Sequence, residues 1–239
     1  SVQLTGKGSN GSPSLLLVSS EGAGNAGDLT IVTPTLTIDG GAQASASTLG
    51  AGQGGKVTVT ADEVTIVGMG QLQDILDRLF LGTITRTEEI GSGIFAASFG
   101  SGRAGDLNLT SRNLTLQNGA FVSTSPFKSG PGGNLTLTAS DTIRLIGSQL
   151  IGESYGSGNA GIITIRTNQL IATEGGAIAA SAFGQGQGGT VLVTANSIDF
   201  IGLTPNNRFK SGLFANAYSN ATTRAGDLRI FTDRLTIKD

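Results

Sequence analysis

A short phrase recurs along this chain at a fixed spacing. It consists of Gly-Gly or Ala-Gly, then any residue, then an apolar, a polar and an apolar residue, as in residues 26–31 and 54–59. Its second glycine falls at Gly27, Gly55, Gly105, Gly133, Gly161, Gly189 and Gly226. Subtracting neighbouring positions gives spacings of 28, 50, 28, 28, 28 and 37. The recurrence of 28 identifies a repeat protein, because a fixed period of this size is typical of stacked structural units.

Each unit carries three short strand signals. The first is typified by residues 29–31 (Leu-Thr-Ile) and the second, seven residues later, by residues 36–38 (Leu-Thr-Ile). Apolar and polar residues alternate with a period of two in both, which predicts strands with one buried face. The third signal is looser and ends on a larger apolar residue in each unit: Leu49, Phe99, Phe127, Tyr155, Phe183 and Tyr218.

Three strands and three corners per unit predict an all-β fold, a single-stranded parallel β-helix of about seven coils of about 28 residues. A β-propeller is the competing architecture, but its blades need about 40 residues and four strands. Stacked coils would place equivalent residues above one another, and the Phe and Tyr residues of the third signal would form one such series near a corner. The first strands would form a continuous buried column: Leu29, Val57, Leu107, Leu135, Ile163, Val191 and Leu228.

A second level of order doubles the repeat, so that its full period spans two units. Odd units carry Ala-Gly before the first strand, as at Ala26 and Ala104, whereas even units carry Gly-Gly, as at Gly54 and Gly132. We expect residues 1–239 to form one domain. The chain opens in mid-pattern, so we also expect it to be a fragment of a longer protein.

The extra residues in the two irregular spacings fall at one place in the repeat. The longer insertion lies at about 69–92 and the shorter one at about 203–211. Both follow the second strand of an even unit, and the segment from Lys7 to Ser14 sits at the same corner of an earlier unit. We therefore expect these insertions to project along one edge of the stack.

The insertions contain the candidate contact residues. In the longer one, Leu72, Ile75, Leu76, Leu79 and Phe80 have the spacing of a short amphipathic helix. Its apolar face could dock on the side of the stack, or it could present Leu79 and Phe80 to a partner. In the shorter insertion, Asn206, Asn207, Arg208 and Lys210 suit contacts with sugars or proteins, or form a solvated turn.

Composition excludes several function classes. The chain has no Cys, His or Trp, which removes zinc sites of the Cys/His kind and Ser-His-Asp or Cys-His catalysis. There are 15 Lys and Arg residues against 17 Asp and Glu residues, so the basic excess of a nucleic-acid-binding protein is missing. The longest aliphatic run, residues 15–18, is far too short to span a bilayer.

Two sequence patterns resemble cofactor sites without the required context. Gly-x-Gly-x-x-Gly starts at five places, but each time it leads into a strand rather than the helix of a dinucleotide site. The aspartate after Gly27 could suggest a calcium-binding repeat, but Lys56 occupies the equivalent place in the next unit. We therefore expect neither a cofactor nor a metal.

Catalysis is the remaining class to consider, because many β-helix proteins cleave polysaccharides. Glycoside hydrolysis uses two facing carboxyl groups. The outward positions of the first two strands do not stack carboxylates on adjacent units, and Arg144 and Asp199 lie two units apart. No catalytic residue is therefore assigned.

The alternating phrases at residues 24–31, 40–48 and 184–191 resemble the repeat region of cyanobacterial filamentous-haemagglutinin-like exoproteins. The resemblance covers essentially the whole chain. It implies right-handed β-helices, export by two-partner secretion through an outer-membrane β-barrel transporter, a secreted or outer-cell-surface location, and adhesion to cells, surfaces or matrix. The Asn-Pro motifs of the family's secretion domain are absent, so the chain would be a downstream piece of the exported protein.

The sequence thus predicts a non-catalytic, adhesive rod segment of a large exoprotein. It would contact surfaces, glycans or other cells through its edge loops, and would stack on the rest of its own chain. A polysaccharide-active β-helix enzyme, either a lyase or a glycoside hydrolase, is the alternative.

Overall fold

The structure, a computed structural model, describes residues 1–6, 13–218 and 223–238. It is built mainly from two sheets in which every strand pair is parallel. The long-strand sheet contains β1 (Val2–Thr5), β3 (Leu29–Val32), β4 (Thr35–Asp39), β6 (Val57–Thr60), β7 (Glu63–Val67), β9 (Leu107–Gln117), β11 (Leu135–Ile146), β13 (Ile162–Thr173), β15 (Thr190–Ile201) and β17 (Asp227–Lys238). The short-strand sheet contains β2 (Leu15–Leu17), β5 (Gln43–Ser45), β8 (Gly93–Phe95), β10 (Phe121–Ser123), β12 (Gln149–Ile151), β14 (Ala177–Ala179) and β16 (Gly212–Phe214). A helix, α1 (Leu72–Phe80), and a 3-10 turn, η1 (Thr87–Glu89), lie between β7 and β8.

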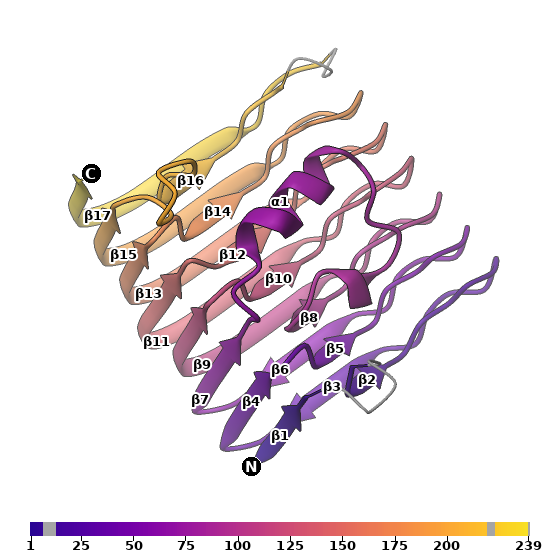
Figure 1. Ribbon diagram of the computed structural model, residues 1–239, viewed down its shortest axis with the longest axis horizontal. Helices are drawn as coiled ribbons and strands as arrows, with labels where there is room; N and C mark the ends of the chain where they lie inside the picture. Colours follow the sequence, from indigo (N-terminus) through magenta and orange to yellow (C-terminus); the bar gives the residue numbers. More distant parts are fainter. Residues whose placement is uncertain (7–12, 219–222, 239) are drawn as a thin grey trace.

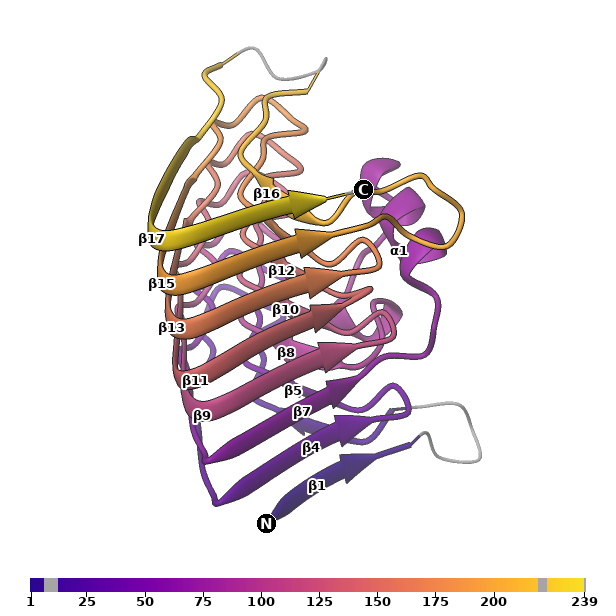
Figure 2. The same cartoon turned by 90° about the vertical axis from the view of Figure 1, so that its left-hand side faces the viewer.

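Strands pair with their counterparts in the neighbouring repeat unit. Leu135 on β11 faces Leu107 on one side and Ile163 on the other, each one repeat unit away in sequence. The same register continues through the column predicted from the sequence, so its stacking is confirmed, whereas the predicted burial does not extend to its ends, Leu29 and Leu228. The long strands therefore lie one above another (Figure 2), and the termini lie at opposite ends of the stack (Figure 1).

The prediction of three separate strands in every unit was wrong for the later units. The first two signals are separate as β3 and β4 and as β6 and β7, but they merge into single strands in β9, β11, β13, β15 and β17. Pro34 explains the first break, because proline has no N–H to donate to the ladder. The backbone N–H groups of Asp62 and Glu63 then both donate to the Pro34 carbonyl, at 3.0 and 3.1 Å. In the later units, hydrogen bonding between strands continues through the corner between the first two signals, so each unit has one long strand there.

The two sheets enclose the main hydrophobic core. Inward side chains of the long strands, such as Leu107 and Leu109, pack there against the middle residue of each short strand, such as Ile94 and Val122. These side chains are fully or almost fully buried. At the ends of the stack the same positions are more exposed, as at Leu228, because a terminal strand has a neighbour on one side only.

Stacking also explains why the repeat is doubled. A Cβ atom built on Gly54 would lie 2.6 Å from the backbone nitrogen of Gly105 in the next coil, and one on Gly132 would lie 2.6 Å from that of Gly161. Both distances are far below a normal non-bonded contact. Even units therefore need glycine at this position, whereas odd units accept the side chain of Ala104, which is buried.

The stack makes a testable prediction about its glycine corners. A Cβ atom on Gly102 would lie 1.7 Å from the carbonyl oxygen of Gly52. The Gly102→Ala substitution should therefore lower the free energy of unfolding by about 3 kcal/mol, since the backbone of two coils must move apart. Urea unfolding followed by circular dichroism measures the change.

Gly24 is the matched control, because it occupies the equivalent corner of an earlier coil and an added Cβ meets no atom within 4 Å. Gly24→Ala should leave stability nearly unchanged. Equal effects of the two substitutions would contradict close stacking at this corner.

Candidate functional site

The longer insertion, residues 69–92, packs against the outward face of the short-strand sheet (Figure 1). Its helix α1 buries four of the five residues of the predicted apolar stripe, with Leu79 only 1% exposed, whereas Phe80 stays 40% exposed. The stripe forms a second hydrophobic cluster with Phe95 and Phe121. Gln43 on β5 donates hydrogen bonds to two carbonyl oxygens of the insertion, at 2.8 and 2.6 Å. Of the two interpretations of the helix, docking on the side of the stack is therefore confirmed.

The shorter insertion, residues 203–211, is a compact turn organised by one threonine. The Thr204 hydroxyl accepts hydrogen bonds from the backbone N–H groups of Arg208, at 3.2 Å, and Phe209, at 3.1 Å. Asn207 has a φ of 59°, in the left-handed region that asparagine tolerates better than most residues. These internal bonds hold the side chains of the turn in fixed places.

The two insertions contact each other through a polar network. Arg208 forms an ion pair with Asp77 on α1 at 2.9 Å, across 131 residues of sequence. Asn206 Nδ2 donates to Gln73 Oε1 at 2.7 Å, and Gln73 Nε2 donates to Asp77 Oδ2 at 3.0 Å. The pKa of Asp77 is lowered mainly by the hydrogen bond from the Gln73 amide, and the hydrogen bond and positive charge of Arg208 lower it further. The insertions thus meet on one edge, as their shared place in the repeat predicted; the third segment, Lys7 to Ser14, falls largely outside the described residues.

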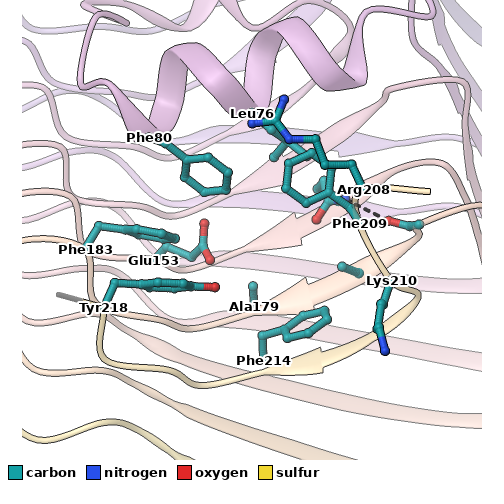
Figure 3. A pocket seen from close by; sticks show the side chains of 13 residues that line it. Leu76, Phe80, Glu153, Ala179, Phe183, Arg208, Phe209, Lys210, Phe214 and Tyr218 are labelled. Carbon is teal, nitrogen blue, oxygen red and sulfur yellow. Dashed lines mark hydrogen bonds between the residues drawn. The ribbon is translucent and has the colours of Figure 1, made fainter. Parts of the chain in front are cut away.

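A cavity of about 320 Å³ lies where the insertions meet the short-strand sheet (Figure 3). This volume is at the lower end of the usual range for small-molecule sites, roughly 300–1,000 Å³. Its lining is mainly aromatic and apolar, with polar groups from the sheet and the loop: Leu76, Phe80, Gln149, Glu153, Gly175, Ala177, Ala179, Phe183, Arg208, Phe209, Lys210, Phe214 and Tyr218. The cavity has room for one compact chemical group.

A ladder of stacked rings leads to the cavity, and its last two members, Phe183 and Tyr218, form one wall of it. The rings follow one another with centroid distances of 4.2–5.2 Å and interplanar angles of 5–10°: Phe99, Phe127, Tyr155, Phe183 and Tyr218. The predicted aromatic series is therefore confirmed, and its spacing follows the separation of paired strands, about 4.8 Å. Phe80 from α1 leans on the ladder, with its ring centroid 5.0 Å from that of Phe183.

Glu153 supplies a buried carboxyl group beside this wall. Glu153 is 5% exposed, and its Oε2 atom accepts a hydrogen bond from the Tyr155 hydroxyl at 2.6 Å. Burial raises the pKa of Glu153 to about 7, although hydrogen bonds from Tyr155 and Ser181 act in the opposite direction. The carboxyl group is therefore poised to gain or lose a proton near neutral pH.

The residues singled out from the sequence occupy different environments. Leu79 is buried on the side of α1 that faces the sheet and offers no surface to a partner. Asn206 is engaged with Gln73, and Asn207 shapes the turn. The other three line the cavity: Phe80, Arg208 and Lys210. Contact with a partner stays a prediction for these exposed residues.

Sequence reasoning missed Glu153, Phe209 and Phe214 as site residues, and it treated Phe183 and Tyr218 only as structural. A signal for Glu153 was present. The position two residues before the large apolar residue of each unit is small or uncharged elsewhere: Ser47, Ala97, Ser125, Ser181 and Asn216. Glu153 is thus the charged exception at a repeat position that is otherwise uncharged, and such an exception indicates a role beyond stacking.

The described residues also answer two other structural questions. Among residues 1–6, 13–218 and 223–238, acidic side chains do not form a group of three or more that could hold a metal ion. In that same part of the chain, α1 is short, and we find no helix with the length and apolar character needed to cross a bilayer.

Comparisons with known protein families, curated proteins and solved structures find no match to this chain. The functional inference therefore depends on the geometry of the edge and on the sequence pattern.

Docking of the insertion can be tested at Leu79. Leu79→Ala should lower the free energy of local opening at the α1 amides by about 3 kcal/mol, because a buried leucine is replaced by a cavity. Hydrogen exchange measures that opening. Leu81→Ala is the control, since Leu81 is exposed, and it should leave exchange unchanged. Similar exchange in both variants would contradict a docked helix.

The Glu153 carboxyl group predicts a pH effect on stability. Its folded pKa, about 7, lies above the ordinary value of 4.5, so the folded state holds the proton more tightly. The associated stability is fully present below the ordinary pKa and is lost as the pH rises through 7. Wild type should therefore lose about 3 kcal/mol of its free energy of unfolding between about pH 4 and about pH 8, and Glu153→Gln should not show this loss.

Urea unfolding at both pH values measures this difference. Glu21→Gln is the control, because Glu21 is exposed and lies away from the cavity lining, and it should follow the wild-type profile. A Glu153→Gln variant that also follows the wild-type profile would show that Glu153 does not titrate in this range.

Proposed function

We propose that this chain is a stretch of a single-stranded, right-handed parallel β-helix of about seven coils, serving as a non-catalytic, adhesive rod. The pairing of each strand with its counterpart one repeat unit away supports the coil assignment. Parallel strands joined by a crossover are right-handed in about 98% of cases, which supports the handedness. In this fold each coil is stabilised mainly by its neighbours, so a long rod can carry binding sites along its side.

One observation carries the adhesive role: two insertions from distant coils build a single cavity on one edge. The coils themselves do not require the Arg208–Asp77 ion pair or the contact between Phe80 and Phe209, whose ring centroids are 5.9 Å apart. An open site assembled from loops on a rigid scaffold is the usual arrangement of a binding module. The edge is therefore the contact surface of the rod.

The repeat phrases support a location outside the cell. Their similarity to filamentous-haemagglutinin-like exoproteins favours export through an outer-membrane β-barrel and display on a cell surface or secretion. The partners would then be glycans, other cells or extracellular matrix. The absence of cysteine fits this route, because a chain exported unfolded forms no premature cross-links.

A polysaccharide-active enzyme is the alternative, and the cavity gives it limited support. Glu153 has the raised pKa that a general acid needs at neutral pH. However, it is the one carboxyl group in the cavity lining, whereas glycoside hydrolysis uses two. Binding without turnover is the function that this lining favours.

A binding screen tests the proposal. The protein should bind one or more glycan arrays, cell surfaces or matrix preparations. An edge variant combining Phe80→Ala, Arg208→Ala and Lys210→Ala should lose about tenfold or more in affinity, because all three side chains line the cavity. Surface plasmon resonance on the positive surfaces measures the loss.

A matched variant combines Val32→Ala, Lys56→Ala and Arg166→Ala, which removes the same number of apolar and basic side chains from exposed positions elsewhere. It should bind like wild type. Point substitutions are preferable to deleting residues 69–92, which would uncover Phe95 and Phe121. Equal binding by the two variants, or release of reducing ends or unsaturated sugars from a polysaccharide, would overturn the proposal.

A further inference from the structure

The cavity is an aromatic enclosure with an open side. Five rings line it: Phe80, Phe183, Phe209, Phe214 and Tyr218. Phe80 connects two walls, since its centroid lies 5.0 Å from that of Phe183 and 5.9 Å from that of Phe209. Phe80 is 40% exposed and Tyr218 is 42% exposed, so solvent reaches the enclosure past their rings. A ligand group can therefore enter without unfolding either insertion.

The carboxyl group of Glu153 points into this enclosure, between the ladder and Phe209 (Figure 3). Among the described residues, the ion pairs do not include Glu153. Neither cation of the lining pairs with Glu153. Arg208 pairs with Asp77 and lies over the Phe209 ring, 5.4 Å from its centroid, and the Lys210 ammonium group points away from Glu153 in Figure 3. Within the part of the chain that the structure describes, the site thus holds a buried carboxyl group with no cation of its own.

A ligand cation would complete this arrangement. The faces of aromatic rings carry negative electrostatic potential and attract ammonium groups. A buried carboxylate is destabilised unless it is paired, so a cation within the cavity would relieve that cost. An anion would meet the carboxylate as a like charge, and a neutral sugar would leave the carboxylate unpaired.

We propose that this cavity binds a quaternary ammonium group, of the trimethylammonium kind found in choline, against the aromatic rings and Glu153. This inference rests on the proposed function, because it names the chemical group that the edge recognises. The cavity volume of about 320 Å³ accommodates such a compact group. The methyl groups would contact the rings, and the positive charge would be compensated by the carboxylate.

The pH dependence of binding follows from the same contact. The pKa of Glu153 is about 7 in the free protein, and a bound cation would lower it by stabilising the carboxylate. Affinity should therefore fall as the pH drops below 7. The titratable and charged groups around Glu153 are Tyr155 and Tyr218 on the ladder, Arg208 and Lys210 on the loop, and Asp77 on α1, which is paired with Arg208.

The test compares choline chloride with 3,3-dimethyl-1-butanol, an uncharged molecule of the same shape, by isothermal titration calorimetry at about pH 8. Wild-type protein should bind choline roughly tenfold more tightly than the alcohol, since only choline gains from the rings and the carboxylate as a cation. Glu153→Gln should remove most of that preference. This variant is expected to remain folded, because it replaces a destabilised buried carboxylate by an uncharged group of similar shape.

Lys56→Ala is the matched control. Lys56 is exposed and lies outside the cavity lining, so its removal should leave choline binding unchanged. Equal binding of choline and the alcohol, no binding of choline, or a loss of choline binding in Lys56→Ala as large as that in Glu153→Gln would overturn the inference.

Two further comparisons distinguish surface-displayed from dissolved ammonium groups, and the adhesive role from the ammonium inference. Retention on choline-coupled agarose, with elution by free choline, would support recognition of headgroups displayed on a surface; binding of free choline alone would assign the cavity to dissolved ammonium compounds. If the edge variant loses surface binding while wild type does not bind choline, the adhesive role stands and the ammonium inference falls. If both edge-dependent surface binding and choline binding are absent, both proposals fall.

Discussion

Backbone hydrogen bonding between neighbouring coils is the constraint on which the rest of the structure depends. Each long strand pairs in parallel with the equivalent strand of the next repeat unit. This pairing holds the coils so close that several corners have no room for a side chain. At Gly52 and Gly105, for example, a Cβ atom would lie 1.8 Å from a carbonyl oxygen of the preceding coil. The high glycine content therefore follows from the distance between coils.

The same pairing decides where additional chain can go. An insertion cannot enter the core between the sheets without breaking the ladder, so it leaves at a corner and folds back on the outside. Because the corners are stacked, insertions from different coils leave along the same edge. This arrangement brings Asp77 and Arg208 together across 131 residues of sequence and creates a second hydrophobic cluster outside the first.

The edge differs from the rest of the molecule in its electrostatics as well as in its shape. The aromatic ladder and α1 remove the Glu153 carboxyl group from water, which raises its pKa to about 7. The nearby arginine is committed to Asp77 and leaves the carboxyl group without a cation. Among the described residues, the edge thus brings a buried carboxyl group together with several aromatic rings.

The sequence by itself determined the repeat unit, the alternation of buried and exposed residues, the column from Leu29 to Leu228, and the aromatic series. All of these depend on local periodicity, and each coil repeats the same contacts. Periodicity could not show that the first two strands merge once Pro34 no longer interrupts the ladder. Only the tertiary structure placed Leu79 in the docking face, joined Asn206 to Gln73, and buried Glu153 among the rings. The physical reason is that these contacts join segments outside the repeat, whose relative positions are set by the stacking of the coils between them.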